Sequence, residues 1–206
     1  MRLPRLHVVT DGAVLARPDF GARLAAVAAL GPRVAVHLRD RSADGRTFWR
    51  VAERWADVIR DARAMLVVSA RPDVAALVRA DAVQLGAGDL AVPDARRVAL
   101  AATMGCSVHS LDGAQAAIED GADYLVAGTI FATPSHPGRS GSGPASLVPL
   151  VATGRPVLAI GGVTVATAGR VRDAGAWGVA VIRAVWEAAD SRSAAEALLA
   201  PWETAA

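Results

Sequence analysis

The sequence predicts a single-domain α/β fold, a (β/α)₈ TIM barrel spanning residues 1–206. Eight short apolar runs, rich in β-branched residues, alternate with alanine-rich amphipathic stretches. Runs that are apolar on both faces are typical of parallel strands covered by helices. A doubly wound open sheet is the alternative, but no GxGxxG motif opens the first unit.

The expected elements follow one another with short connections. The strands are predicted at Leu6–Thr10, Val34–Leu38, Met65–Ser69, Ala82–Leu85, Ser107–His109, Tyr124–Ala127, Val157–Ile160 and Gly178–Ile182. Amphipathic helices are predicted at Thr47–Arg60, Pro72–Val78, Pro93–Thr103, Leu111–Asp120, Thr164–Ala174 and Trp186–Leu199.

The segment Pro156–Val185 carries the clearest functional signal. A strand ends at Gly161-Gly162 and leads into a helix, and a second strand ends at Ile182-Arg183. Glycines let a backbone approach a ligand where a Cβ would intrude, and a helix start offers free N–H groups to phosphate. Barrels build phosphate sites after strands seven and eight, so we expect one here. The alternative is an ordinary crossover with a glycine-rich turn.

The composition argues against several classes of function. The chain is 53% hydrophobic, with mean hydropathy +0.33 and a net charge of +2. No apolar run reaches the ~20 residues of a membrane helix, and the start has no signal-like apolar segment, so we expect a cytoplasmic protein without membrane contact. Scattered arginines without an aromatic platform predict no nucleic-acid partner. There is no lysine, which excludes Schiff-base chemistry and a Walker-type phosphate lysine.

Polar residues just beyond strand ends face the active site of a barrel. The candidates are His37, Arg39, Arg41, Gln84, Asp89, Ser107, His109, Thr129, Thr133, Ser135, His136 and Arg183.

Three of these candidates occupy every second position at the end of the second predicted strand. His37, Arg39 and Arg41 fall on one face because strand side chains alternate with period two. Two converging guanidiniums predict an anionic ligand, carboxylate or phosphate. The alternative is a salt-bridged rim with Asp40 and Asp44.

The other titratable candidates are weaker signals. His109 is a candidate proton shuttle, or a structural hydrogen-bonding group. His136 lies in the Ser/Gly/Pro-rich segment Thr133–Pro144, which is either a lid that closes over substrate or an inert loop. Asp89 is a candidate Mg²⁺ ligand acting through a diphosphate. The histidines are too dispersed for a metal motif.

The ordered segments LHVVTD, VHLRDRS, AVQLGAGDL, SVHSLDGA, ADYLVAGTIFATPSHPG, VLAIGG and GVAVIRAV resemble the thiamine-phosphate synthase superfamily. The resemblance spans nearly the whole chain and implies a (β/α)₈ barrel. The superfamily contains the synthase, which joins a pyrimidine diphosphate to thiazole phosphate, and the thiazole tautomerase (TenI) branch.

The resemblance implies a thiazole-phosphate site. Thr133 and Ser135 match the superfamily's TxT-like pair, and Gly162, Ile182 and Arg183 match its backbone phosphate contacts. Gly161 completes the glycine pair.

The pyrimidine-diphosphate half departs from the synthase pattern. The QLREK motif reads His37-Leu38-Arg39-Asp40-Arg41, and the Asn-Asp pair that holds diphosphate and Mg²⁺ is replaced by Ser69-Ala70. Asp89, the second metal carboxylate, and Ser107, a pyrimidine-diphosphate contact, are retained. The loop lysine is replaced by His136.

A histidine before Leu-Arg, a Val-Gln-Leu fourth strand containing Gln84, and SVHSL place the chain nearer the tautomerase branch. That reaction needs no metal or cofactor, and it shifts a proton to aromatise a thiazole-phosphate carboxylate. The branch's sixth-strand histidine is Thr129 here, so His109 or His37 is expected to carry the proton.

The sequence therefore leads us to expect a tautomerase. The alternatives are an Mg²⁺-dependent synthase and a catalytically silent relative that binds a phosphate ligand. The expected partner is a small-molecule thiazole phosphate, or another phosphate ligand in the case of the silent relative. Trp49 and Trp55 either mark a homo-oligomer interface or pack onto the barrel.

Overall fold

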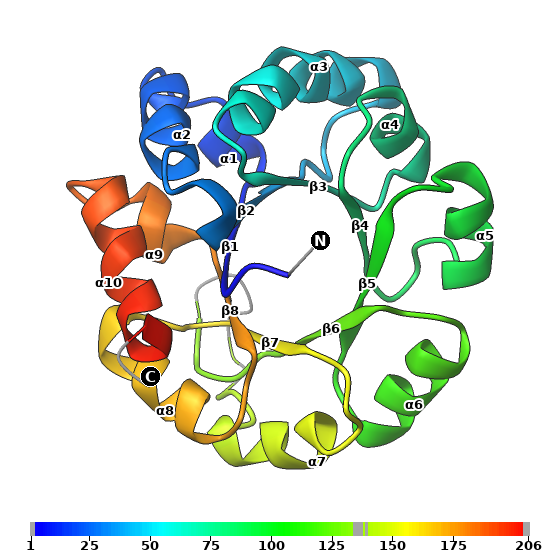
Figure 1. Cartoon of the computed structure of the whole chain (residues 1–206), viewed down its shortest axis with the longest axis vertical. Coiled ribbons are helices and arrows are strands. Elements are labelled where there is room, and N and C mark those ends of the chain that lie inside the picture. The colour runs from blue at the N-terminus through cyan, green and yellow to red at the C-terminus, as the bar shows by residue number, and fades with distance from the viewer. Residues whose placement is uncertain (1–2, 134–137, 139, 204–206) are drawn as a thin grey trace.

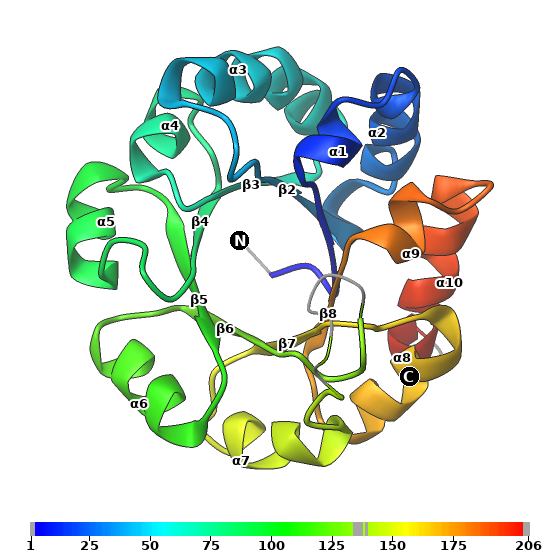
Figure 2. The same ribbon diagram turned by 180° about the vertical axis from the view of Figure 1, so that it is seen from behind.

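The chain forms a closed barrel of eight parallel strands surrounded by helices (Figure 1). The computed structural model describes residues 3–133, 138 and 140–203. Every strand pairs with the next along the chain, and β8 closes the ring by pairing with β1. Figure 2 shows the same ring from the opposite end. The predicted (β/α)₈ TIM barrel is confirmed.

The strands are short and evenly spaced. They are β1 (Leu6–Val9), β2 (Val34–Leu38), β3 (Met65–Ser69), β4 (Ala82–Leu85), β5 (Thr103–Val108), β6 (Tyr124–Ala127), β7 (Val157–Ile160) and β8 (Gly178–Val181). The helices are α1 (Gly12–Leu15), α2 (Phe20–Ala28), α3 (Gly45–Asp61), α4 (Pro72–Leu77), α5 (Val92–Val98), α6 (Leu111–Glu119), α7 (Val148–Val151), α8 (Val165–Asp173), α9 (Arg183–Trp186) and α10 (Ser191–Glu203), with 3₁₀ turns at Gly31–Arg33 and Pro144–Leu147.

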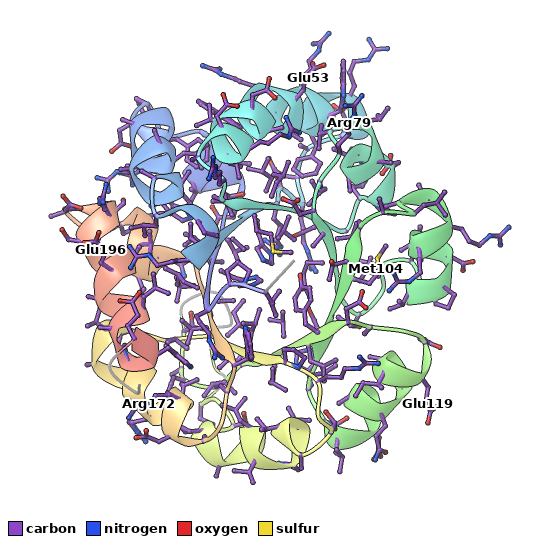
Figure 3. All side chains as sticks on the ribbon, in the orientation of Figure 1. Glu53, Arg79, Met104, Glu119, Arg172 and Glu196 are labelled. Atoms are coloured by element: carbon purple, nitrogen blue, oxygen red, sulfur yellow. The ribbon has the colours of Figure 1, made fainter. Side chains whose placement is uncertain are left out.

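Two apolar layers hold the barrel together. The outer layer packs strands against helices and includes the fully buried Met104 and Leu125. The inner layer fills the ring with side chains such as Met65, Val67 and Leu158. Figure 3 shows side chains filling the ring, whereas charged residues such as Glu53 project outward from the helices. Because both faces of each strand are covered, the strand sequences are almost uniformly apolar.

The fifth unit differs from the sequence prediction. Strand β5 begins at Thr103 rather than Ser107, and the preceding helix α5 ends at Val98 rather than at Thr103. The backbone N–H of Thr103 donates to Asp81 O, which starts the strand pairing. This segment contains Gly105 and Cys106 instead of a β-branched run, so its local sequence does not predict a strand.

The last helix, predicted at Trp186–Leu199, begins later than expected. Helix α9 ends at Trp186, and α10 begins at Ser191. The Ser191 hydroxyl donates to Val185 O at 2.9 Å, and Asp190 accepts the Ser193 N–H at 2.8 Å to start the new helix. Figure 1 shows α9 and α10 between α2 and α8, beside the seam between β1 and β8.

Both helix-face tryptophans, Trp49 and Trp55, are partly buried and pack against the core. Trp55 lies edge-on to Phe20, with ring centroids 5.3 Å apart, and joins α3 to α2. A Cβ on Gly21 would lie 2.8 Å from the Trp55 ring, so Gly21 permits this close approach. None of the helices in the described residues has the length and apolarity needed to cross a membrane.

Candidate functional site

A cavity of about 960 Å³ opens at the carboxyl ends of the strands. All eight strands, or the loops directly after them, contribute to its wall. Its lining includes Asp11, His37, Arg39, Arg41, Ser69, Ala70, Gln84, Asp89, Ser107, His109, Thr129, Thr133, Gly161, Gly162, Ile182 and Arg183. This is the face of a barrel on which active sites are built.

Two arginines give the cavity a basic wall. Arg39 and Arg41 follow β2, and neither guanidinium has a hydrogen bond or ion pair with the other described residues. Asp40 instead accepts hydrogen bonds from the Ser42 backbone and hydroxyl, and Asp44 caps the start of α3. The salt-bridged rim that was the alternative is therefore not formed. Both cations remain available to an anionic ligand.

Arg39 is the more deeply placed of the two cations. Burial and the neighbouring Arg41 lower its pKa, while Asp11, Asp89 and Asp40 oppose this shift. Arginine nevertheless stays charged in proteins. A partly buried guanidinium has lost some of its hydration. A phosphate or carboxylate that accepts two parallel N–H bonds from it replaces that hydration and binds strongly.

The acidic side of the cavity fits an Mg²⁺ that arrives with a phosphate ligand. Asp89 Oδ2 accepts the Gly86 N–H at 2.7 Å, and no described residue bonds its Oδ1. Asp11 Oδ1 accepts the Val14 N–H at 2.9 Å. No group of three or more His, Cys, Asp or Glu among the described residues can hold a metal ion. Mg²⁺ commonly binds through one or two carboxylates and substrate phosphates, so Asp89 fits only that shared arrangement.

The loop after β3 has an unusual backbone conformation at Ala70. This residue has φ of 64°, in the left-handed region that asparagine and aspartate enter more readily than alanine. Ala70 lines the cavity directly after β3. The backbone therefore suits an acidic or amide side chain, although the sequence supplies a methyl group.

The glycine pair after β7 has a packing requirement as well as the predicted ligand role. Gly161 and Gly162 have φ of 96° and 62°. A Cβ on Gly161 would lie 2.6 Å from Thr129 Cγ2, and one on Gly162 would lie 2.8 Å from Phe131 Cβ. The loop after β6 thus packs directly on this turn. Both glycines still line the cavity with their backbone.

The end of β8 supplies the rest of the predicted phosphate site. Ile182 precedes the short helix α9, and Arg183 begins it; both line the cavity. Arg183 Nε lies 3.4 Å from Glu187 Oε1, one helical turn later. The predicted phosphate contacts are therefore brought to one corner of the cavity, where Arg183 shares its charge with Glu187.

His37 lies on the cavity floor and is 1% exposed. Its Nε2 lies 2.7 Å from Nδ1 of His7, which is buried beneath it. Burial lowers the pKa of His37 to about 3 and also lowers that of His7. At neutral pH His37 is an uncharged hydrogen-bonding group, and a pKa this low makes it a weak base.

His109 is exposed beside the cavity, in contrast to His37. Its Nδ1 bonds the backbone carbonyl of Gly128. Gln84 is nearly buried, and its amide nitrogen donates to Leu85 O and to the Ser107 hydroxyl, at 3.2 and 3.1 Å. Gln84 therefore positions Ser107 within the lining.

Thr129 and Thr133 complete the lining contributed by the loop after β6. Ser135 and His136, with the other residues of the predicted lid at 134, 137 and 139, lie outside the described residues. Their predicted roles stay predictions.

Two polar residues beneath the cavity were not found from the sequence. His7 and Tyr124 are 0% and 1% exposed and point into the ring. His7 is separated by two positions from the inward-facing Val9, so the period-two rule could have placed it inside. Its pairing with His37 depends on the register between β1 and β2, in which Val9 lies opposite His37.

Comparison with known proteins gives consistent results. The thiamine-phosphate synthases of Chloroflexus aurantiacus and Methanoculleus marisnigri are each 40% identical to this chain, over 200 and 196 residues, covering 95% and 94% of it and 91% and 92% of their own lengths. The structure of a thiamine phosphate pyrophosphorylase from Pyrococcus furiosus superposes with a TM-score of 0.84 at 34% identity, covering 98% of this chain and 96% of that one.

A family model described as thiamine monophosphate synthase (TMP-TENI) matches residues 6–185, which include every strand of the barrel and all of the described cavity lining. The chain therefore belongs to the thiamine monophosphate synthase (TMP-TENI) family and is an enzyme of thiamine biosynthesis.

Proposed function

We propose that this chain is a thiamine-phosphate synthase, which joins hydroxymethylpyrimidine diphosphate to thiazole phosphate. The single observation that carries this proposal is the pair of cavity arginines beside Asp89, Arg39 and Arg41, whose guanidiniums have no partner in the described part of the chain. The sequence alone favoured a tautomerase, but the relatives at about 40% identity are named as synthases. We therefore prefer the synthase.

The basic wall suits the diphosphate. Joining the two rings expels diphosphate, so negative charge increases on that group in the transition state. Arg39 and Arg41 face this position from β2, and fixed cations aimed at developing charge lower the barrier. Mg²⁺ carried by the diphosphate would neutralise further charge on the leaving group, with Asp89 as its protein ligand.

The opposite corner suits the second substrate. Gly161, Gly162 and Ile182 offer backbone to the phosphate of thiazole phosphate, and Arg183 adds a cation there. The two anionic groups thus bind at separate places, at β2 and at β7–β8. This separation orients the two rings toward each other across the cavity and reduces the entropic cost of their reaction.

The test is a coupled assay with both substrates and Mg²⁺, reading out thiamine phosphate and released diphosphate. Wild type should form both products in equal amounts. Arg39→Ala should lose most of the activity, whereas Arg50→Ala, an exposed arginine on α3, should retain it. Absence of product from the wild-type protein would refute the synthase proposal.

A thiazole tautomerase is the second candidate, and Ala70 is the observation that favours it. Where a synthase is expected to have a carboxylate, this chain has a methyl group in the cavity wall. A UV time course with thiazole-phosphate carboxylate, without metal or pyrimidine, tests it. Catalysed aromatisation that is lost in the double variant His37→Gln/His109→Gln would support this candidate. Ligand binding without turnover in both assays would instead indicate a catalytically silent relative.

A further inference from the structure

The loop after β6 lies directly on the glycine turn that follows β7. The backbone N–H of Phe131 donates to Gly161 O at 2.9 Å. A Cβ on Gly162 would lie 2.8 Å from Phe131 Cβ, so the two segments are in close contact. Both glycines line the cavity, whereas Phe131 is not part of its wall. Phe131 therefore contacts the turn from outside the cavity.

The bond from Phe131 fixes the orientation of one peptide group. The carbonyl of Gly161 and the N–H of Gly162 belong to the same trans peptide, so they point in opposite directions. Because Gly161 O accepts from Phe131 outside the cavity, the Gly162 N–H is directed to the cavity side. The N–H groups of Gly162 and Val163 have no hydrogen-bond partner among the described residues. Both are donors that an anion can use.

Two consecutive glycines would otherwise permit the opposite orientation. Without a Cβ, glycine adopts positive and negative φ about equally readily, so the peptide between Gly161 and Gly162 can rotate at little cost. The rotated peptide would present Gly161 O to the cavity, and a carbonyl oxygen repels an anion. The bond from Phe131 opposes this rotation. The donors are then oriented before the ligand arrives, which reduces the entropic cost of binding.

Phe131 is itself held in place by two contacts. Its ring is partly buried against the apolar core, and Arg170 Cζ lies 5.4 Å from the ring centroid. Arg170 is exposed on α8, outside the ring of strands (Figure 1), and its guanidinium has no ion pair or hydrogen bond with another described residue. A guanidinium over an aromatic face is attracted to it electrostatically. Arg170 thus joins α8, the helix that follows the glycine turn, to the loop that lies on the turn.

We propose that Phe131 and Arg170 are positioning residues for the phosphate group of the ligand. Phe131 holds the peptide between Gly161 and Gly162 with its N–H toward the cavity. Arg170 holds Phe131 on the turn without touching the ligand, since it is not part of the cavity wall. On the proposed function, on which this assignment rests, the ligand is thiazole phosphate.

Inorganic phosphate and thiazole phosphate probe this corner of the full-length protein. In ¹H–¹⁵N correlation spectra each anion should shift the Gly162 amide proton downfield, and the titration gives its Kd. A scalar coupling across the hydrogen bond, from the Phe131 nitrogen to the Gly161 carbonyl carbon, should be present before either anion is added. Absence of this coupling, or no response of Gly162 to either anion, would overturn the inference.

Side-chain variants test the contact that holds Phe131. Arg170→Gln removes the cation and Phe131→Leu removes the aromatic face, so each should raise the Kd for inorganic phosphate about two- to fivefold, the usual value of an exposed cation–π contact. Arg170→Lys keeps a cation and should recover part of the affinity. Arg172→Gln is the matched control, because Arg172 lies on the same helix but bonds Asp173 and Pro201 O. An equal loss in Arg172→Gln would mean that general loosening of α8 is the cause, and would overturn the inference.

The double variant Arg170→Gln/Phe131→Leu distinguishes positioning from a direct effect of charge. If Arg170 acts through the Phe131 ring, the double variant should bind phosphate no more weakly than the weaker single variant. Additive losses would mean that Arg170 attracts the anion directly, and would overturn the inference. If Phe131→Leu does not fold, Arg170→Gln still decides, because this exposed change should weaken the coupling between Phe131 and Gly161.

Comparison of the two anions separates this inference from the proposed function. Binding of inorganic phosphate at Gly162 without binding of thiazole phosphate would refute the proposed substrate and still support the role of Phe131. In an active synthase, Arg170→Gln should raise the KM for thiazole phosphate by the same factor as the Kd, and leave the KM for the pyrimidine diphosphate unchanged. An active synthase in which neither value for the phosphate ligands changes would refute the positioning role alone.

Discussion

Trp186 donates its indole N–H to the backbone carbonyl of Val9 at 2.8 Å. This bond joins the helix that follows the last strand to the end of the first strand, at the seam where the barrel closes. The Trp186 side chain is fully buried and packs against Phe20, with ring centroids 5.3 Å apart. One side chain thus links α9, β1 and α2.

Replacing Trp186 should weaken the closed barrel. Trp186→Phe removes the bond to Val9 and part of the buried ring, so we expect a loss of about 2–4 kcal/mol in the free energy of unfolding. Urea unfolding followed by circular dichroism measures it. Trp49→Phe is the control, because Trp49 is only partly buried and its indole has no hydrogen bond with another described residue. Equal losses in the two variants would contradict this account of the seam.

The two cavity arginines should contribute unequally to diphosphate binding. Arg39 is the more buried, so Arg39→Ala should weaken binding of the pyrimidine diphosphate by about 10- to 100-fold, the usual value of a charge-assisted hydrogen bond. Arg39→Lys keeps the charge but loses the planar fork and should recover only part of the affinity. Isothermal titration calorimetry provides the measurement. Unchanged affinity in Arg39→Ala would place the diphosphate elsewhere.

Ala70→Asp should strengthen the metal side of the cavity. Its left-handed backbone tolerates aspartate, and the new carboxylate would join Asp89 as a second oxygen ligand. We expect synthase activity to reach half-saturation at a lower Mg²⁺ concentration. Ala70→Asn has the same backbone preference without the charge, and it should show a smaller change. A Mg²⁺ requirement identical in all three proteins would mean that residue 70 does not face the metal.

The buried histidine pair predicts acid-sensitive folding. The folded pKa of His37 is about 3, against a usual value of 6.5, so the unfolded chain binds a proton that the folded chain excludes between these values. Stability is therefore full above pH 6.5 and falls as the pH drops toward 3. The loss from His37 should be about 1 kcal/mol between about pH 7 and 5.5, and His7, whose pKa is also lowered by burial, should add to it in the same direction.

Variants assign this pH dependence to the pair. His37→Gln should flatten the curve of unfolding free energy against pH, whereas His109→Gln, which changes an exposed histidine, should leave its slope unaltered. Denaturant titrations at a series of pH values would show it. An unchanged slope in His37→Gln would mean that His37 is not excluded from protonation in the folded state.

Local sequence was sufficient for most of the fold. Doubly apolar strands such as Val34–Leu38 and Tyr124–Ala127 have the bounds that were predicted, because a strand covered on both faces must be apolar along its length. The prediction was wrong where packing replaced propensity. Strand β5 forms over Gly105 because the small residue leaves space for Tyr124, which belongs to the neighbouring strand.

The sequence by itself determined the barrel, the family resemblance and which polar residues end the strands, since each of these depends on residue order. Only the tertiary structure decided which of those residues are free to act. Among the described residues, the Arg39 and Arg41 guanidiniums have no partner, because Asp40 and Asp44 bond within their own loop. His37 is neutral because the closed ring buries it on His7, thirty residues away in the chain. Charge state and pairing depend on solvent exclusion and on contacts between strands, and residue order does not record these.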